Sequence, residues 1–478
     1  MYRQIAAQIR ARIEAGELDA GDRLPAIRDL ARTLGVNRDT VALAYDALAT
    51  EGSLESTVGR GTFVREPTRP GPPLEPPELR LSPLVDGLLE FERARPHYGG
   101  AADAIGFHSL VPEPSLYPVA AFRRSVNRVL AEGGGELLLY GDRQGHPGLR
   151  EVLAERFAQQ GMRVTAQDLT LCQGASQGIA LALRLFTRPG DAVAVEEPTY
   201  TNVLAALRSL GLVPVPVPME ERGPDLEILE RVLARPEVKL LYTIPTFHNP
   251  LGTTTPRAHR RELLAVAARA GTPVVEDAYE MDLRFEGAEV APLAALDGQG
   301  LVVHLYSLSK SLFPGARVGA ITARGRAVEG LRALRQATDL GGSPLLQAAV
   351  AELVASGGYD RHLLQLRRTL KRRIRTLLEA LESEMPGEVR FTRPQGGYQV
   401  WVELPGSVDT RELLADAMRA GVLFAPGAAF AHDGRRSSGL RLTVAQTDEE
   451  TIRRGVGILA KVVQTSLRSG VRGSSVQL

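Results

Sequence analysis

The stretch S-L-S-K-S-L-F-P-G-A-R-V-G at residues 307–319 decides how this chain is interpreted. It follows the apolar run L-V-V-H-L-Y and holds Lys310 between hydroxyl residues, ahead of a Pro-Gly break. A lysine that forms a Schiff base needs a fixed, partly desolvated amine near a phosphate-binding site. Ser307 and Arg317 can hold a phosphate, which carries nearly two negative charges at neutral pH. The alternative is an ordinary exposed lysine in a loop.

Lysine is scarce in this chain, which has only four: Lys239, Lys310, Lys371 and Lys461. Lys371 lies among charges in T-L-K-R-R-I-R, Lys461 lies in a C-terminal helical pattern, and Lys239 leads into a strand-like run. None of these three has surroundings comparable with those of Lys310, which is therefore the predicted reactive lysine.

Four further residues can complete a site for a phosphorylated pyridine cofactor. Asp277 ends the run V-V-E-D, so its carboxylate can keep a ring nitrogen protonated, as an electron sink requires. Tyr279 and Asn249 (in H-N-P-L-G) can bind the ring's phenolic oxygen. Tyr200, in E-E-P-T-Y, can stack on the ring. Each has an ordinary alternative as a cap, a turn or a loop residue.

The sequence G-A-S-Q at 174–177 follows the strand-like run D-L-T-L-C-Q and opens a helical pattern. The N–H groups of a helix's first turn, together with its dipole, suit a phosphate. Ala175, Ser176 and Gln177 are therefore candidates for the same phosphate site.

Between residues 104 and 465, strand-like runs alternate with amphipathic helical patterns, such as the one at 257–270. The runs lie at 191–196, 238–244, 272–277 and 301–307. This alternation predicts βαβ units and a mostly parallel sheet. Residues 65–103 are predicted to be a linker, because seven prolines between 66 and 83 favour an extended segment, and 466–478 are predicted to be a disordered tail.

Residues 1–64 have the layout of a winged helix: three short helical patterns, then two strand-like runs around Gly59-Arg60-Gly61. The third helix, capped by Asn37, can enter the major groove and present Arg38 and Thr40. Arg28 and Arg60 can reach phosphates or the minor groove. The alternative is a small dimerisation or capping domain, and charge does not decide, since residues 1–66 hold nine arginines and ten acidic residues.

Two family resemblances sharpen these predictions. The run from L-P-A-I-R-D-L to G-R-G-T-F-V resembles the GntR-type winged helix, in which the positions of Arg28, Arg38, Thr40 and Arg60 commonly contact DNA. One departure is Ala26, where that family usually has a small hydroxyl residue that caps the second helix.

Residues 106–463 resemble fold type I, class I aminotransferases, with a small C-terminal α+β subdomain. The resemblance implies that pyridoxal 5'-phosphate forms an internal aldimine with Lys310, and it gives the residues above their cofactor contacts. It also implies that Tyr140, in L-L-Y-G-D, reaches a phosphate in the neighbouring subunit, and that Arg441, in G-L-R-L-T-V, binds an amino acid's carboxylate.

The fusion of the two halves resembles the MocR/GabR subfamily of GntR regulators. That group implies a head-to-tail homodimer that binds a double-stranded DNA operator and responds to an amino-acid or amine effector.

Composition excludes few classes of protein. The net charge of +1 gives no global attraction to nucleic acid, so DNA contact requires a local patch. The single cysteine, Cys172, and the absence of an apolar leader or span predict a cytoplasmic protein without membrane contact, and no metal is expected.

Three functions fit these features: a regulator that senses pyridoxal phosphate or an amino compound through aldimine chemistry at Lys310, a working aminotransferase that carries a DNA-binding module, and a regulator that uses the large domain only as a scaffold. The third is the weakest, because a scaffold does not need Lys310, Asp277 and Arg317 together. The DNA-binding domain favours the first.

Overall fold

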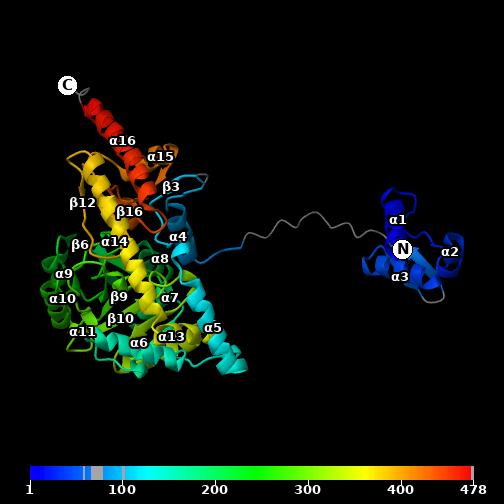
Figure 1. The fold of residues 1–478 in the computed structure, drawn as a ribbon, viewed down its shortest axis with the longest axis horizontal. Helices are drawn as coiled ribbons and strands as arrows, with labels where there is room; N and C mark the ends of the chain where they lie inside the picture. Colours follow the sequence, from blue (N-terminus) through cyan, green and yellow to red (C-terminus); the bar gives the residue numbers. More distant parts are fainter. Residues whose placement is uncertain (58–59, 66–78, 100–102, 475–478) are drawn as a thin grey trace. The chain divides into compact units, whose positions relative to one another are not determined.

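The chain forms two compact units, Met1–Arg80 and Leu81–Leu478 (Figure 1). The computed structural model describes residues 1–57, 60–65, 79–99 and 103–474. The linker expected over 65–103 is too long, because helix α4 (Pro83–Arg93) packs on α8 (Thr201–Ser209) within the larger unit. Residues 66–78 and 100–102 of that expected linker lie outside the described residues.

The smaller unit has the predicted winged-helix order. Its elements are α1 (Tyr2–Glu14), α2 (Ile27–Leu34), α3 (Arg38–Thr50), β1 (Leu54–Thr57) and β2 (Gly61–Val64). Ile5 and Ile9 of α1 pack with Val41 and Leu48 of α3 in one core. The two strands pair antiparallel, with Leu54 opposite Val64. Gly59, predicted at the hairpin tip, lies outside the described residues.

The helix boundaries in this unit follow from capping. Gly35 ends α2 in the left-handed conformation, at φ 60°. Asn37 Oδ1 accepts a hydrogen bond from the Asp39 N–H at 3.0 Å and starts α3, as predicted. Ala26 occupies the N-cap of α2 and provides no side-chain cap. The second helix therefore starts without the hydrogen bond that a hydroxyl residue would supply.

The larger unit is built on an eight-stranded sheet of order β4-β11-β10-β9-β8-β5-β6-β7. Strands β6, β5, β8, β9 and β10 run parallel, as predicted, whereas β4, β11 and β7 pair antiparallel with their neighbours. The strands span Leu169–Cys172 (β4), Ala192–Glu197 (β5), Val213–Glu220 (β6), Gly223–Pro224 (β7), Val238–Thr243 (β8), Val274–Ala278 (β9), Val302–Ser307 (β10) and Gly319–Thr322 (β11).

Helices cover this sheet (Figure 1). Its central strands are therefore buried on both faces, which explains why their sequences are nearly continuous apolar runs. They are α5 (Val119–Gly133), α6 (Pro147–Gln159), α7 (Ala175–Phe186), α8, α9 (Leu226–Leu233), α10 (Arg257–Ala270), α11 (Leu293–Leu296), α12 (Arg326–Thr338) and α13 (Pro344–Ala355). Single 3₁₀ turns lie at Pro114–Leu116, Gly134–Leu138, Ala166–Asp168, Met281–Leu283 and Pro314–Ala316.

A smaller α+β part completes the C-terminal half, as expected. A four-stranded antiparallel sheet joins β12 (Arg390–Phe391), β13 (Gln399–Glu403), β16 (Gly439–Thr443) and β15 (Ala425–Pro426). Strand β14 (Val422–Leu423) pairs parallel with β3 (Ile105–Gly106). Helices α14 (Gly358–Glu384), α15 (Thr410–Arg419) and α16 (Glu449–Ser474) and the turn Gly427–Phe430 accompany them.

Helix α16 corrects the disordered tail expected over 466–478 as far as residue 474, because the helix continues to that residue. Residues 475–478 lie outside the described residues. Gly455 on this helix packs against Phe107, and Val456, Leu459 and Val463 belong to the core. The helix is thus anchored over its first turns and extends from there. Among the described helices, none is both long and apolar enough to cross a bilayer.

Candidate functional site

A cavity of about 640 Å³ lies in the larger unit, where strands of the main sheet end. Ligand sites of open α/β sheets form at the carboxyl ends of the strands. Of the twelve predicted cofactor and effector residues, ten line this cavity: Ala175, Ser176, Tyr200, Asn249, Asp277, Tyr279, Ser307, Lys310, Arg317 and Arg441. Gln177 and Tyr140 do not.

Asp277 is the buried carboxylate of the cavity, at the end of β9, and is 1% exposed. Its Oδ2 atom accepts a hydrogen bond from the Tyr242 hydroxyl at 2.7 Å, whereas Oδ1 is buried with no partner among the described residues. Burial raises the pKa of Asp277 to about 6, although the Tyr242 hydroxyl and the Tyr279 N–H oppose the shift. An unpaired buried carboxylate oxygen is costly, so it is a place for a cationic donor.

Lys310 lies just after β10, and its Nζ atom donates to the Leu110 carbonyl at 2.9 Å. Burial lowers its pKa to about 8; Arg441 acts in the same direction and Glu280 opposes it. The hydroxyl of Tyr398 donates to the Lys310 carbonyl at 2.8 Å and fixes the backbone. The amine is therefore held in place and closer to neutrality than a free lysine, which a nucleophilic lysine requires.

Glu280 is a carboxylate that the sequence did not single out. It is 1% exposed, and no described residue donates a hydrogen bond of standard geometry to either oxygen. Burial raises the pKa of Glu280 to about 7, against the charge of Lys310 and the hydroxyl of Tyr279. Its neighbour Gly397 has no room for a side chain, because a Cβ there would lie 2.4 Å from Glu280 Oε2. Glu280 can thus hold a proton close to the lysine.

The predicted phosphate site combines the N-terminus of α7 with the loop after β10. Gly174 is the N-cap of α7 at φ 82°, and a Cβ there would lie 3.1 Å from Arg317 Nη1. Arg317 donates to the Gln173 carbonyl at 2.5 Å, and Ser307 is 3% exposed. Behind this cradle, the Cys172 thiol contacts the Gly174 carbonyl at 3.4 Å.

Gln177 departs from the expectation, because its side chain turns away from the cavity. Its Nε2 atom donates to Asp339 at 2.5 Å, and its Oε1 atom accepts from Arg335 at 3.0 Å and from the Gln173 N–H at 2.8 Å. Gln177 thereby shapes the cradle from behind, and only its backbone N–H is left for an anion. Ser309, within the stretch 307–319, lines the cavity although the sequence did not single it out.

Arg441 lies on β16 and is 7% exposed. Its Nη1 atom donates to Asn249 Oδ1 at 2.8 Å and its Nη2 atom to the His108 carbonyl at 2.7 Å, whereas Nε is buried and finds no partner in the part of the chain that the structure describes. The guanidinium lies 4.9 Å from the centroid of the Phe430 ring. It is therefore a buried, incompletely paired cation in the cavity, which fits an incoming carboxylate.

The two predicted ring-binding tyrosines are held by hydrogen bonds that the sequence did not reveal. The Tyr279 hydroxyl donates to the Phe247 carbonyl at 3.0 Å and accepts from Gln399 at 2.7 Å. The Tyr200 hydroxyl accepts from Asn202 at 2.8 Å. Burial raises the pKa of Tyr200 to about 12, so both tyrosines are neutral near pH 7.

Tyr140 is 84% exposed and lies outside the cavity. Its exposed position is compatible with the expected contact to a neighbouring subunit, which remains a prediction.

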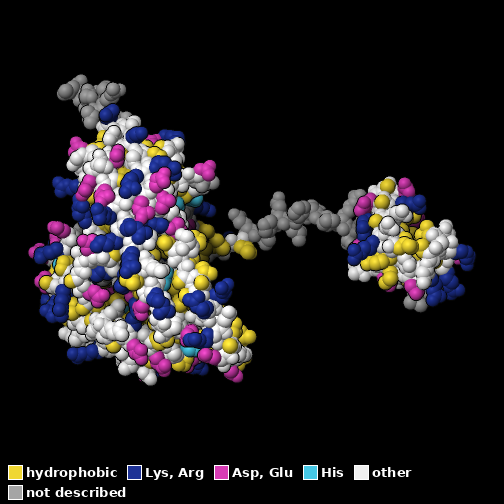
Figure 2. Space-filling model, in the orientation of Figure 1, with side chains coloured by type: hydrophobic (Ala, Val, Ile, Leu, Met, Phe, Trp, Pro, Cys, Tyr) yellow, Lys and Arg dark blue, Asp and Glu magenta, His cyan; other side chains and the backbone are white. Residues whose placement is uncertain are grey.

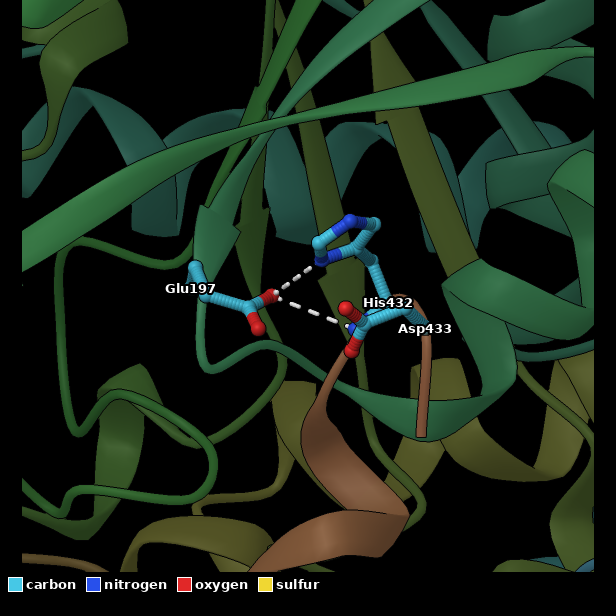
Figure 3. A group of neighbouring side chains, drawn as sticks. All are labelled: Glu197, His432 and Asp433. Carbon is cyan, nitrogen blue, oxygen red and sulfur yellow. Dashed lines mark hydrogen bonds and ion pairs between the residues drawn. The ribbon is translucent and has the colours of Figure 1, made fainter. Parts of the chain in front are cut away.

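A cluster of three residues of the kinds that bind metal ions lies outside the cavity (Figure 3). Glu197, His432 and Asp433 could each offer one atom to a metal ion. Glu197 Oε2 lies 3.3 Å from His432 Nδ1 and accepts from the His432 N–H at 3.2 Å, but Arg435 donates to Glu197 Oε1 at 3.0 Å. Because a guanidinium already neutralises this carboxylate, the ion pairs join the end of β5, just before Tyr200, to the segment that follows Phe430.

The predicted DNA contacts lie on the smaller unit. Arg28, Arg38 and Arg60 are exposed, and Thr40 is half-buried at the start of α3. Arg28 and Arg38 line one depression with Arg23, which the sequence did not single out. On the face of the larger unit that Figure 2 shows, basic and acidic side chains are interspersed, without an extended basic surface.

Comparison with known proteins agrees with this division. Residues 1–64 match the family described as bacterial regulatory proteins, gntR family, and residues 113–459 match aminotransferase class I and II. The uncharacterized HTH-type transcriptional regulator YdcR of Escherichia coli is 30% identical over 98% of this chain and 99% of its own length. The probable rhizopine catabolism regulatory protein MocR of Rhizobium meliloti is 29% identical over 96% of this chain and 93% of its own.

Among solved structures, a multiple substrate aminotransferase from Thermococcus profundus matches with a TM-score of 0.74 at 30% identity. The match covers 82% of this chain and 97% of that one, so nearly the whole enzyme is similar to a part of this chain about as long as the larger unit.

Proposed function

This chain belongs to the class I and II aminotransferase family and carries a gntR-family DNA-binding domain, as MocR-type regulators do. On that premise, we propose that an amino compound binds in the cavity and thereby changes the affinity of the protein for DNA. It is a transcription regulator with a pyridoxal phosphate domain. Lys310 as the attachment point, an amino-acid effector and a head-to-tail homodimer in the cytoplasm are the proposed details.

The observation that carries this proposal is the set of unpaired polar atoms in one cavity. Asp277 Oδ1 and Arg441 Nε are buried without partners among the described residues, and Ala175 and Ser176 of the first turn of α7 line the cavity together with Ser307 and Arg317. A cationic ring nitrogen, a carboxylate and a phosphate would satisfy these three places, so the residues present fit pyridoxal phosphate and an amino acid. Bound pyridoxal phosphate supplies an electrophilic carbon that exchanges the lysine amine for a ligand amine.

The chain's own residues do the rest. The carboxylate of Asp277 would hold the ring nitrogen in its protonated form, Tyr200 would stack on the ring, and Asn249 and Tyr279 would bind its phenolic oxygen. Lys310 Nζ would take up a proton on release from the cofactor, and Glu280, whose pKa burial raises to about 7, is the buried acid that could supply it. Arg441 orients the carboxylate of the incoming amino acid.

A working aminotransferase is the second candidate, because the same residues serve both functions and the solved relative is an enzyme. The smaller unit favours regulation, since a transaminase has no need of exposed arginines on a winged helix.

The test combines visible absorbance with a DNA-shift assay on wild type and Lys310→Ala. We expect borohydride to attach the cofactor to the wild-type chain and not to Lys310→Ala, and amino acids to change DNA affinity only in wild type. Lys371→Ala is the control, since Lys371 is exposed and pairs with Glu286 at 3.7 Å. Attachment in Lys310→Ala would contradict the assignment, and DNA affinity that no amino acid alters would favour the enzyme.

A further inference from the structure

A second cavity, of about 540 Å³, lies in the larger unit beside the cofactor cavity. Its walls come from α4, from α8, from α15 and from residues 426–434. The proposed function gives this cavity no part. We propose that it binds a second ligand, an organic carboxylate with an apolar body, which does not react with the cofactor. This binding goes beyond the proposed function and can be tested without it.

Two arginines that line this second cavity form no ion pair with an acidic residue in the described part of the chain. Arg208 Nη2 donates to the His432 carbonyl at 2.7 Å, and its Nη1 atom donates to the Leu204 carbonyl at 3.4 Å. Arg411 Nη2 donates to the Gly434 carbonyl at 2.7 Å. These carbonyls hold both guanidiniums in place but do not neutralise them. A ligand carboxylate can therefore form charge-assisted hydrogen bonds with the N–H groups that remain.

Arg208 is the better placed of the two cations. It is half-buried, and its guanidinium lies 4.1 Å from the centroid of the Phe91 ring. Burial lowers the pKa of Arg208, because the protein around it solvates the charge less well than water does. A stacked, partly desolvated cation without an acidic partner gains more from an anion than a free surface arginine does.

The rest of the second cavity is mainly apolar. Its lining includes Phe91, Pro96, Leu414, Pro426 and four alanines. Sites for small organic ligands are typically clefts of about 300–1,000 Å³ with mainly apolar walls and a few polar groups. An inorganic ion would leave most of these walls in contact with water. The composition of the lining therefore favours an organic anion.

A cationic ligand would find less favourable partners in the second cavity. The acidic residues of the lining are Glu90 and Asp433. Asp433 Oδ1 already accepts a hydrogen bond from the Arg435 N–H at 3.0 Å and lies 4.0 Å from Arg435 Nε. Glu90 is exposed, so water screens its charge. Negative charge is consequently the charge that the cavity stabilises best.

The second cavity and the cofactor cavity share a wall. Four residues line both: Arg95, Pro96, Thr201 and Ala429. Thr201 follows Tyr200 and donates from Oγ1 to the Ala429 carbonyl at 2.9 Å, and Ala429 precedes Phe430. Since Tyr200 and Phe430 both line the cofactor cavity, a ligand in the second cavity should change the affinity of the first. Such coupling acts equally in both directions.

The experiment measures binding of benzoate, phenylacetate and 2-naphthoate to the full-length, cofactor-loaded protein by ligand-detected NMR. The corresponding primary amides serve as uncharged probes of nearly the same shape. None of these acids has an amine, so none can exchange with Lys310. We expect at least one carboxylate to bind about tenfold more tightly than its amide, because charge-assisted hydrogen bonds are about twice as strong as neutral ones.

Two variants locate the binding. Arg208→Gln and Arg411→Gln should each lower the carboxylate affinity by about fivefold or more and leave the amide affinity unchanged. Arg411 is exposed, so its variant should keep the wild-type melting temperature even if loss of Arg208 disturbs the fold. Arg231→Gln is the matched control, because Arg231 also donates to the carbonyl four residues before it, at 3.3 Å, but does not line this cavity.

The coupling between the cavities has a measurement of its own. A saturating carboxylate should change the affinity for pyridoxal phosphate by about fivefold or more in wild type and leave it unchanged in Arg411→Gln. No change in wild type would refute the coupling. An equal loss of affinity in both proteins would mean that the carboxylate competes in the cofactor cavity, which would overturn the inference.

Two further results would overturn the inference. In the first, every amide binds wild type as tightly as its carboxylate, or both arginine variants keep the wild-type affinity. In the second, Arg441→Gln abolishes carboxylate binding while Arg208→Gln and Arg411→Gln retain it, because the anion would then lie in the cofactor cavity. None of these results bears on the proposed function, which Lys310→Ala tests separately.

Discussion

The two units of this chain present their functional groups in opposite ways. In the larger unit, Asp277, Ser307 and Arg441 are less than a tenth exposed, and Asp277 Oδ1 and Arg441 Nε have no hydrogen-bond partner among the described residues. In the smaller unit, Arg28, Arg38 and Arg60 are exposed to water. In a buried site, polar atoms without partners indicate the shape and charge of the ligand. An exposed site gives no such indication, because water can pair with its polar atoms. Substitutions should consequently have larger and more specific effects in the first unit.

The largest effect should come from Asp277→Asn. The amide cannot neutralise a cationic ring nitrogen, so we expect cofactor affinity to fall on the order of 100-fold, as for a lost buried charge pair. Without cofactor, the same variant should be more stable than wild type at pH 7.5, by roughly 1–3 kcal/mol, because burial disfavours the ionised carboxylate. Equilibrium dialysis and thermal unfolding measure the two effects.

Asp277→Asn should lower cofactor affinity but raise stability, and the reason for this difference can be tested in the cofactor-free protein. The folded-state pKa of Asp277 is about 6, above its ordinary 3.8, so the folded protein binds this proton more tightly. Its contribution to stability is therefore present below about pH 4 and is lost as the pH rises to about 6. Asp277→Asn should flatten this part of the stability profile. An unchanged profile would mean that folding does not raise the pKa of Asp277.

Cofactor binding should depend on pH for two reasons. Below about pH 6 protonation of Asp277 should weaken affinity, by about tenfold for each further pH unit. Between pH 6 and 8 the rate of attachment should rise, because the pKa of Lys310 is about 8 and only the neutral amine reacts. Stopped-flow absorbance checks both limbs, and a rate that continues to climb well beyond pH 9 would show that the lysine is not shifted.

In the smaller unit, Arg38→Ala should weaken DNA binding by about tenfold and lower the salt dependence by about one counterion. Cofactor affinity should not change, because Arg38 lies in the other compact unit. Arg32→Ala is the comparison, since Arg32 is also exposed on this unit but lies outside the depression with Arg28 and Arg38. Equal losses for both variants would indicate a diffuse electrostatic contact.

The smallest effect should come from Ala26→Ser. A serine at this N-cap can accept a hydrogen bond from the first turn of α2, which now has no side-chain cap. We expect the smaller unit to gain about 0.5–1 kcal/mol in stability, with no change in the larger unit. Unfolding of an isolated 1–80 fragment, or of the first transition of the full chain, measures the gain.

Sequence predicted the parts of the site that follow strands. Lys310, Asp277 and Asn249 sit directly after β10, at the end of β9 and after β8, so local patterns were enough to bring them to one edge of the sheet. The predicted strand at 238–244 and helix at 257–270 agree with β8 and α10. These elements are local in sequence, and their hydrophobic patterns are strong.

The missed residues depend on contacts between distant segments. Tyr242 reaches Asp277, 35 positions away, and Gln399 reaches Tyr279, 120 positions away. The segment of Arg95 and Tyr98 was interpreted as linker, because prolines dominate the residues before it, and its burial depends on packing against α8. Tertiary packing of this kind leaves no periodic pattern in the sequence.

The thiol of Cys172, behind the predicted phosphate site, can be used to measure how often this part of the structure opens. Burial raises the pKa of Cys172 to about 12, so a disulfide reagent can react only when the β4–α7 junction transiently opens. With no second cysteine in the chain, the labelling rate reports a single site without mutagenesis. Bound phosphate should lower the labelling rate of Cys172. The size of this decrease would measure how strongly the bound anion suppresses opening of the β4–α7 junction.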